Sequence, residues 1–175
     1  MRVLAPQIRP ALVDDAQAIA RVQVATWQHT YRGILPEPFL ESLDVERSAE
    51  SWRAVIADRR RITQVVDCPG VVGFCTAGPS RGEHAGYQGE LEAIYILPAE
   101  QGRGHGTALI RAAMRWLLER DLEPVLVWAL EANRAAHGFY ESLGARQLDT
   151  RLLRIANALY PEVGLGWPAG AFSGR

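Results

Sequence analysis

The stretch LPAEQGRGHGTALI, residues 97–110, places three alternating glycines directly before an amphipathic run. These are Gly102, Gly104 and Gly106. Glycine adopts backbone conformations that other residues avoid, and it lets the chain approach a ligand closely. A helix N-terminus adds N–H groups without intrahelical partners and a partial positive charge. The stretch therefore predicts a turn into a helix that ends near Asp121. The first amides of that helix would face an anion, with a diphosphate as the natural ligand.

Two common phosphate-binding motifs do not fit this stretch. A dinucleotide fingerprint needs G-x-G-x-x-G, whereas the glycines here are spaced by two throughout. A P-loop needs a lysine, and all 19 basic residues of the chain are arginine. The absence of lysine also excludes Schiff-base chemistry on a lysine. A glycine-rich turn without a ligand is the alternative interpretation of the segment.

The composition indicates a soluble globular protein. With 175 residues, of which 48% are hydrophobic and 22% charged, the chain is long enough to bury a core. A net charge of −1 gives no basic excess, so we expect no nucleic-acid partner. We interpret the run Arg59–Arg61 as a solvated helix end. Because the sequence contains neither a signal-peptide core nor a membrane span, we expect a cytoplasmic protein with no membrane partner.

Hydrophobic periodicity predicts both helices and strands along the rest of the chain. Further helices are expected from a capping box at Asp14–Gln17 to near Gly33, from Pro36 to Ile56, and over 135–143. Strands are expected over 62–67, 71–77, 90–97, 124–130, 146–155 and 158–167, after a short extended segment at 5–11. Cys68 and Cys75 flank a turn off-register, so no disulfide is expected. We interpret residues 1–175 as one α+β domain with a mixed central sheet.

Several separate segments resemble one protein family. Gln101–Gly106 matches the Q/R-x-x-G-x-G/A signature of the GNAT N-acetyltransferase superfamily. Glu90–Pro98 resembles the strand before that signature, Asn133–Gly144 a later N…FYE..G motif, and Ile8–Asp14 the first strand and helix entry. The resemblance covers roughly residues 8–167. It implies a three-layer fold with a mixed, mostly antiparallel twisted sheet of about six to seven strands flanked by helices.

The resemblance also implies acetyl-CoA as the acyl donor and no metal. The amides of Gly102 to Thr107 would hold the pyrophosphate, and strand backbone near Ile94 and Ile96 would pair with the pantetheine arm. Asn133 would hydrogen-bond that arm. The full set of implied cofactor-binding residues is Ile94, Tyr95, Ile96, Gln101, Gly102, Arg103, Gly104, His105, Gly106, Thr107, Asn133 and Tyr140.

Acetyl transfer to an amine needs a group that takes the ammonium proton and a proton source for the departing thiolate. By resemblance Tyr140 is the general acid at sulfur; the alternative is a tyrosine packed in the core beside Phe139. Glu90 and Glu92 lie two apart on one predicted strand and so project from the same face. Either could be the base, and a solvated strand face is the alternative. Glu90 fits the strand pattern of the family better and is preferred.

The acceptor is expected to be a primary amine of a small molecule or a peptide. Trp27, Tyr31 and Trp128 could form the walls of its pocket, although core aromatics at helical spacing fit equally well. Because neither cysteine is placed as an acyl carrier, we expect direct transfer in a ternary complex. By analogy with the family we also expect a homodimer, with the apolar tail GWPAGAFSGR at the interface.

Two other functions are consistent with parts of the sequence. One is a sensor that binds acyl-CoA without turnover, against which the presence of both Asn133 and Tyr140 argues. The other is a serine hydrolase, since Gly78–Gly82 is a formal G-x-S-x-G match. That elbow must lead directly into a helix, and the following EHAGYQG has no helical pattern. The histidines at 29, 84, 105 and 137 show no metal-ligand spacing and are expected in loops or on the surface.

Overall fold

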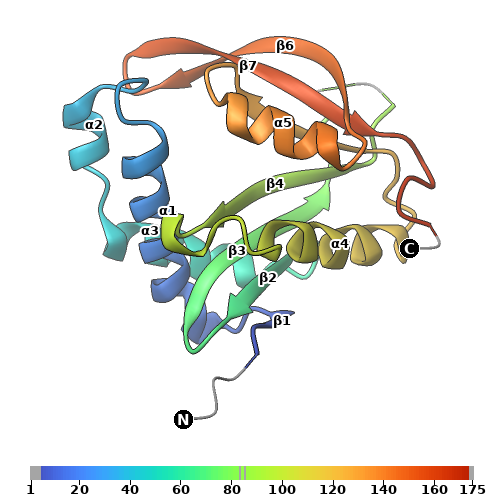
Figure 1. Ribbon diagram of the computed structural model, residues 1–175, viewed down its shortest axis with the longest axis horizontal. Helices are drawn as coiled ribbons and strands as arrows, with labels where there is room; N and C mark the ends of the chain where they lie inside the picture. The colour runs from blue at the N-terminus through green and yellow to red at the C-terminus, as the bar shows by residue number, and fades with distance from the viewer. Residues whose placement is uncertain (1–4, 83, 85, 174–175) are drawn as a thin grey trace.

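The computed structural model describes residues 5–82, 84 and 86–173. Seven strands form one sheet in the order β1-β2-β3-β4-β5-β7-β6, with β1 at the bottom of Figure 1 and the β6–β7 hairpin at the top. Only the β4–β5 pairing is parallel, which confirms the mixed and mostly antiparallel sheet. The strands are β1 Gln7–Pro10, β2 Ile62–Asp67, β3 Val71–Pro79, β4 Gly89–Ile96, β5 Val125–Leu130, β6 Arg146–Ile155 and β7 Ala158–Trp167.

Five α-helices and two 3-10 turns connect the described strands. Helices α1 and α3 pack on one face of the sheet, against a cluster that includes Phe74 and Ile19. Helices α4 and α5 pack on the other face, against a cluster that includes Leu91 and Trp167. The helices are α1 Ala16–Thr30, α2 Glu37–Glu41, α3 Val45–Ala57, α4 His105–Leu118 and α5 Arg134–Ser142, and the 3-10 turns are Val13–Asp15 and Pro98–Glu100.

Helix α4 follows the predicted pattern closely. Its apolar residues Leu109, Ile110, Ala113 and Leu117 recur three to four positions apart and are fully buried. Each fully buried leucine contributes roughly 1.5–3 kcal/mol relative to exposure. The same stripe orients the first turn of the helix, because it presses that end of α4 onto the end of β4.

The region expected to be helical from Pro36 to Ile56 is divided into two helices, α2 and α3. The Asp44 carboxylate accepts a hydrogen bond from the Arg47 N–H at 2.7 Å and so starts α3 as an N-cap. The capping box expected at Asp14–Gln17 is also displaced. Instead, Asp15 accepts from the Leu12 N–H at 2.7 Å and closes a 3-10 turn before α1.

The arginine run lies just beyond a helix, and the C-terminal tail packs in part on the core. Helix α3 ends at Ala57, and Arg60 and Arg61 both bind Asp58; the Arg60 side chain is 80% exposed, as expected of a solvated run, whereas that of Arg61 is 28% exposed. In the tail, Phe172 packs edge-on against Trp167 with the ring centroids 6.0 Å apart. This part of the tail therefore covers its own core. No helix among the described residues has the length and apolar character needed to cross a membrane.

The parallel pairing of β4 with β5 stops early. It joins only residues 89–91 to residues 125–127, although both strands continue. In the β3–β4 pairing Leu91 faces Ala77 and Ala93 faces Thr76, so Glu92 is an extra residue that forms a β-bulge. A bulge bends its strand and increases the local twist. Beyond this point β4 and β5 separate, and the gap opens between the two faces of the sheet.

Gly89 begins the parallel pairing and has no space for a side chain. A Cβ there would overlap the backbone carbonyl oxygen of Leu122, whereas a Cβ at Gly138 in α5 would meet nothing within 4 Å. We predict that Gly89→Ala lowers the free energy of unfolding by about 1–3 kcal/mol. The matched change Gly138→Ala should raise it by about 0.5–1 kcal/mol, because alanine favours a helix over glycine. Urea unfolding of both variants tests this; equal effects would contradict the packing described for Gly89.

Candidate functional site

A cavity of about 490 Å³ fills the gap between β4 and β5. It runs from the glycine-rich loop before α4, past α5, to α1 on the opposite face of the sheet. Most of the residues proposed from the sequence line it. These are Tyr31, Glu92, Ile94, Tyr95, Ile96, Gln101, Gly102, Gly104, Gly106, Thr107, Trp128, Asn133 and Tyr140. Trp27, Glu90, Arg103 and His105 are not among its lining residues.

Positive φ angles shape the loop at the mouth of the cavity. Gly102 has φ +74° and Gly104 has φ +82°, values that side chains other than glycine rarely adopt. The Gln101 side chain donates a hydrogen bond to the Ile96 carbonyl at 3.0 Å. Gln101 therefore fastens the loop to the end of β4, and the chain turns directly into α4.

The backbone amides of this loop are unpaired among the described residues. Within the part of the chain that the structure describes, no acceptor pairs with the backbone N–H groups of residues 102–107. The first bond into α4 is donated by Ala108 to the Gly104 carbonyl at 3.1 Å. Six consecutive N–H groups at a helix N-terminus, beside a cavity, form an anion-binding surface.

Gly106 lies where α4 meets α5. A Cβ at this position would be 2.9 Å from the Phe139 ring and 3.5 Å from Ile96. Glycine thus allows the loop, β4 and α5 to approach one another around the cavity. Phe139 also lines the cavity, and its place in the FYE segment beside Tyr140 was the available sequence signal for it.

Two side chains of the loop, Arg103 and His105, lie beside Glu100. Exposed Arg103 forms an ion pair with Glu100 at 3.2 Å, and His105 Nε2 lies 3.6 Å from the same carboxylate. His105 is buried, as is His137, whose Nε2 lies 3.0 Å from the Leu130 carbonyl oxygen. The expectation that the histidines lie in loops or on the surface is therefore wrong for these two, because both fill interior positions at helix starts.

Asn133 begins α5 as an N-cap. Its side-chain oxygen accepts a hydrogen bond from the Ala136 N–H at 3.2 Å. Asn133 and Tyr31 both line the cavity, and the Asn133 side chain lowers the pKa of Tyr31 against the effect of burial. The cavity therefore brings together residues of α5 and α1, which pack on opposite faces of the sheet.

Three tyrosines line the cavity, and burial raises the pKa of each. The effect is largest for Tyr95 and Tyr140, and for Tyr31 the hydrogen bond from Asn133 partly offsets it. Tyr140 packs edge-on against Trp167 with the ring centroids 5.9 Å apart. Its phenol therefore keeps its proton at neutral pH and stays in a fixed orientation.

The two candidate carboxylates have different environments. Glu90 is 1% exposed, and both of its oxygens accept hydrogen bonds from Arg81. Glu92, at the bulge, lines the cavity and accepts a hydrogen bond on one oxygen from Arg61 Nε at 2.8 Å. Of the two, only Glu92 is in contact with the cavity.

Aromatic side chains surround the α1 end of the cavity. Trp27 packs edge-on against Tyr31 with centroids 5.1 Å apart, behind the lining. Trp128 lines the cavity and carries the Arg151 guanidinium 4.1 Å above its ring. Sequence reasoning missed Thr26 and Thr30, which line the same end. Their spacing of four residues on α1 places them on one helix face and was the available signal.

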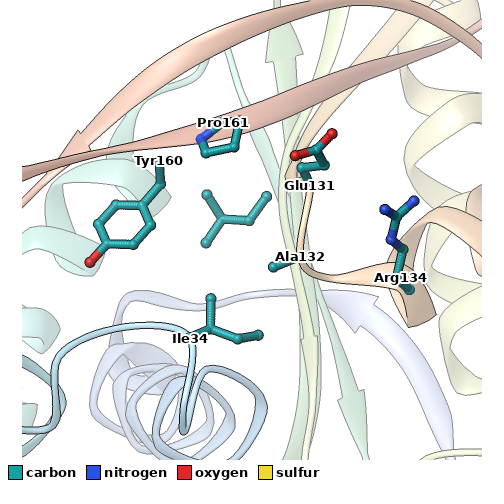
Figure 2. Close-up of a pocket in the computed structure, with 7 residues that line it drawn as sticks. Ile34, Glu131, Ala132, Arg134, Tyr160 and Pro161 are labelled. Atoms are coloured by element: carbon teal, nitrogen blue, oxygen red, sulfur yellow. The ribbon is translucent and has the colours of Figure 1, made fainter.

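A second, smaller hollow of about 120 Å³ lies at the outer side of Leu130. Figure 2 shows Ile34 and Tyr160 on one side of it and Glu131 and Arg134 on the other. It is bounded by the segment between α1 and α2 and by the beginning of β7.

The remaining motifs take structural roles. Gly78 and Pro79 are the last residues of β3, and the described residues between Ser80 and β4 form no helix. The strand-to-helix elbow of a serine hydrolase is therefore missing at this match. Cys68 and Cys75 are both free thiols, as expected. Among the described residues no group of three or more histidine, cysteine or acidic side chains is arranged to hold a metal.

Comparison with known proteins identifies the family. Residues 24–145 match the model of the acetyltransferase (GNAT) family, and the chain belongs to that family. It is 35% identical over 162 residues, 92% of each chain, to YuaI of Bacillus subtilis strain 168, an uncharacterized N-acetyltransferase.

Two further likenesses are more limited. A segment of 56 residues is 43% identical to the mycothiol acetyltransferase of Thermobispora bispora, but it is only 32% of this chain and 19% of that protein. The fold matches the PaiA N-acetyltransferase of Thermoplasma acidophilum, solved in complex with coenzyme A, with a TM-score of 0.75 at 18% identity. That match covers 91% of this chain and 98% of the other.

The buried phenols make the free energy of unfolding depend on pH. Folding raises the pKa of Tyr140, so above about pH 10 the unfolded chain releases a proton that the folded chain keeps. The free energy of unfolding must then fall as pH rises. We predict that Tyr140→Phe makes this fall less steep by up to about 1.4 kcal/mol per pH unit. Urea unfolding between about pH 9 and pH 11 measures the slope, and an identical slope in both proteins would contradict the burial of this phenol.

Proposed function

We propose that this protein transfers the acetyl group of acetyl-CoA to a primary amine by direct attack in a ternary complex. The observation that carries the proposal is the set of unpartnered N–H groups at residues 102–107, at the mouth of a cavity that crosses the sheet. These donors suit an anion, and a long ligand could extend through the gap from the loop to α1.

The residues present fit coenzyme A. The six loop amides would hold its pyrophosphate, and the backbone of residues 92–96, beyond the end of the β5 pairing, would bind the pantetheine arm as an added strand. Asn133, Phe139 and Tyr140 would flank the arm on the α5 side. Bound acetyl-CoA supplies an acetyl group activated as a thioester.

Glu92 is the residue that we propose to take the proton from the acceptor. An amine with an ordinary pKa near 10.4 is an ammonium at neutral pH and must lose a proton before it can attack. A carboxylate at the bulge attracts the cation and accepts this proton directly or through one water. Glu90, favoured from the sequence, is less suited, because Arg81 occupies both of its oxygens outside the cavity.

Tyr140 is proposed to donate to the sulfur of the leaving thiolate. Its raised pKa keeps the hydroxyl protonated. Because a thiol has an ordinary pKa near 8.5, complete transfer from a buried phenol is uphill, and the main contribution is a hydrogen bond to the developing negative charge. The edge-on packing on Trp167 fixes the direction of that bond.

The acceptor would enter from the α1 side, which Tyr31, Trp128 and the threonines of α1 line. The carboxylates and arginines near this end are paired with each other, Glu92 with Arg61 and Glu162 with Arg151. The site thus presents aromatic surface and balanced charge to its acceptor. It is suited to a primary amine of a small molecule or a peptide.

The cofactor part of the proposal predicts a specific effect at Gly104. Alanine at φ +82° is strained by roughly 1–2 kcal/mol, and relief of this strain turns the loop amides away from the phosphates. We expect Gly104→Ala to weaken coenzyme A binding by about tenfold or more. Gly70→Ala, at φ +92° in the β2–β3 turn, imposes similar strain away from the cavity and should leave the affinity unchanged. Calorimetric titration of both variants tests this, and equal losses would contradict the role of the loop.

The activity is tested by thiol release from acetyl-CoA with a panel of primary amines. We expect turnover with at least one amine. Tyr140→Phe should lower kcat by about 10²-fold or more, with the affinity for coenzyme A nearly unchanged. Coenzyme A binding without turnover on any amine would overturn the proposal in favour of a sensor. An unchanged kcat for Tyr140→Phe would remove this residue from the reaction.

A further inference from the structure

We propose that Arg61 is a positioning residue that fixes the carboxylate of Glu92 for proton transfer, with Asp58 anchoring the guanidinium from the other side. This inference rests on the proposed function, in which Glu92 takes the proton of the acceptor amine. It gives a role to the arginine run, which the sequence alone suggested was a solvated helix end, and to the first glycine of the G-x-S-x-G match.

The guanidinium of Arg61 bridges two carboxylates. Its Nε donates to Glu92 Oε1 at 2.8 Å, and its Nη1 donates to Asp58 Oδ2 at 2.7 Å. Arg60 also binds Asp58, and its hydrogen bonds lower the pKa of that carboxyl to about 2. Because an aspartate has an ordinary pKa of about 3.9, Asp58 is ionised near neutral pH with or without Arg60. The guanidinium is held at both ends, between the end of α3 and the bulge of β4.

Gly78 provides the space for this contact. A Cβ at Gly78 would lie 2.9 Å from Arg61 Cγ and 3.1 Å from Glu92 Oε1, and 3.3 Å from a backbone carbonyl. Any side chain at this position, near the end of strand β3, would push Arg61 or Glu92 aside. The glycine is thus explained by the ion pair beside it and not by a nucleophile elbow.

The geometry leaves one oxygen of Glu92 available. Arg61 occupies Oε1, and no donor among the described residues binds Oε2. The side chain is mostly buried, at 14% exposure, and lines the cavity. A free glutamate would sample several rotamers, whereas one held by a rigid guanidinium keeps its second oxygen in one place. Glu90 has no oxygen left available in this way, because Arg81 binds both of its oxygens.

The test is a double-mutant cycle on the full-length protein with an acceptor amine found in the panel. Arg61→Gln should lower kcat by about tenfold or more in the parent protein, and by less than about twofold when Glu92→Gln is already present. Coenzyme A affinity should stay within about twofold, since Arg61 does not line the cofactor loop. Arg61→Lys should keep a higher kcat than Arg61→Gln. Lysine keeps the positive charge but lacks the planar guanidinium that binds Glu92 and Asp58 at the same time.

Arg60→Gln is the matched control. Arg60 binds the same aspartate, is 80% exposed and makes no contact with Glu92 among its hydrogen bonds. We expect less than about a twofold change in kcat from it. If Arg61→Gln does not fold, as judged by thermal melting and coenzyme A binding, then Asp58→Asn and Gly78→Ala take its place in the same cycle.

The outcomes distinguish this inference from the proposed function. If the parent protein acetylates an amine but the effects of Arg61→Gln and Glu92→Gln multiply independently, Arg61 does not act through Glu92 and the inference is wrong. An unchanged kcat for Arg61→Gln would also refute it, while the acetyltransferase function would stand. If the parent protein acetylates no amine, both are overturned.

Discussion

The early end of the pairing between β4 and β5 is the constraint on which the rest of the site depends. The two parallel strands share only the pairs from Gly89 to Leu91, and the bulge at Glu92 then turns β4 away. Each strand keeps a partner on its outer side, β3 for β4 and β7 for β5, so the sheet stays intact while its middle opens. An opening of this kind leaves strand backbone without a partner strand and so available to a ligand, and it connects the α4–α5 face with the α1–α3 face.

The chemistry at the site follows from what borders this opening. At one end the loop before α4 presents N–H groups and no side-chain cation among its cavity-lining residues, since Arg103 binds Glu100. At the other end charges occur in pairs, and Arg61 binds Glu92, the carboxylate among the cavity-lining residues. In the proposed function, backbone N–H groups would bind the anion, and the side chains Glu92 and Tyr140 would handle the proton.

Much of the fold and part of the site could be predicted from the sequence. The glycine-rich loop, the helix after it and the strands of a mixed sheet follow from local spacing, because glycine and hydrophobic periodicity act over a few residues. The family resemblance supplied the mostly antiparallel sheet of the GNAT fold and the residues expected around the cofactor. The choice between Glu90 and Glu92 could not be made in this way. Both lie on one strand, and what separates them is a bulge and two arginines, Arg61 and Arg81, brought close by the fold from distant positions. The split of α2 from α3 depended on Asp44, a single capping hydrogen bond within an otherwise helical pattern.

Amide hydrogen exchange of residues 102–107, with and without coenzyme A, tests the central claim most directly. These N–H groups have no partners among the described residues, so they should exchange rapidly in the free protein. Binding of coenzyme A should slow them together by at least about tenfold, while amides in the β2–β3 turn keep their rates. Tight binding of coenzyme A with unchanged exchange at all six positions would show that the phosphates lie elsewhere and would contradict the account.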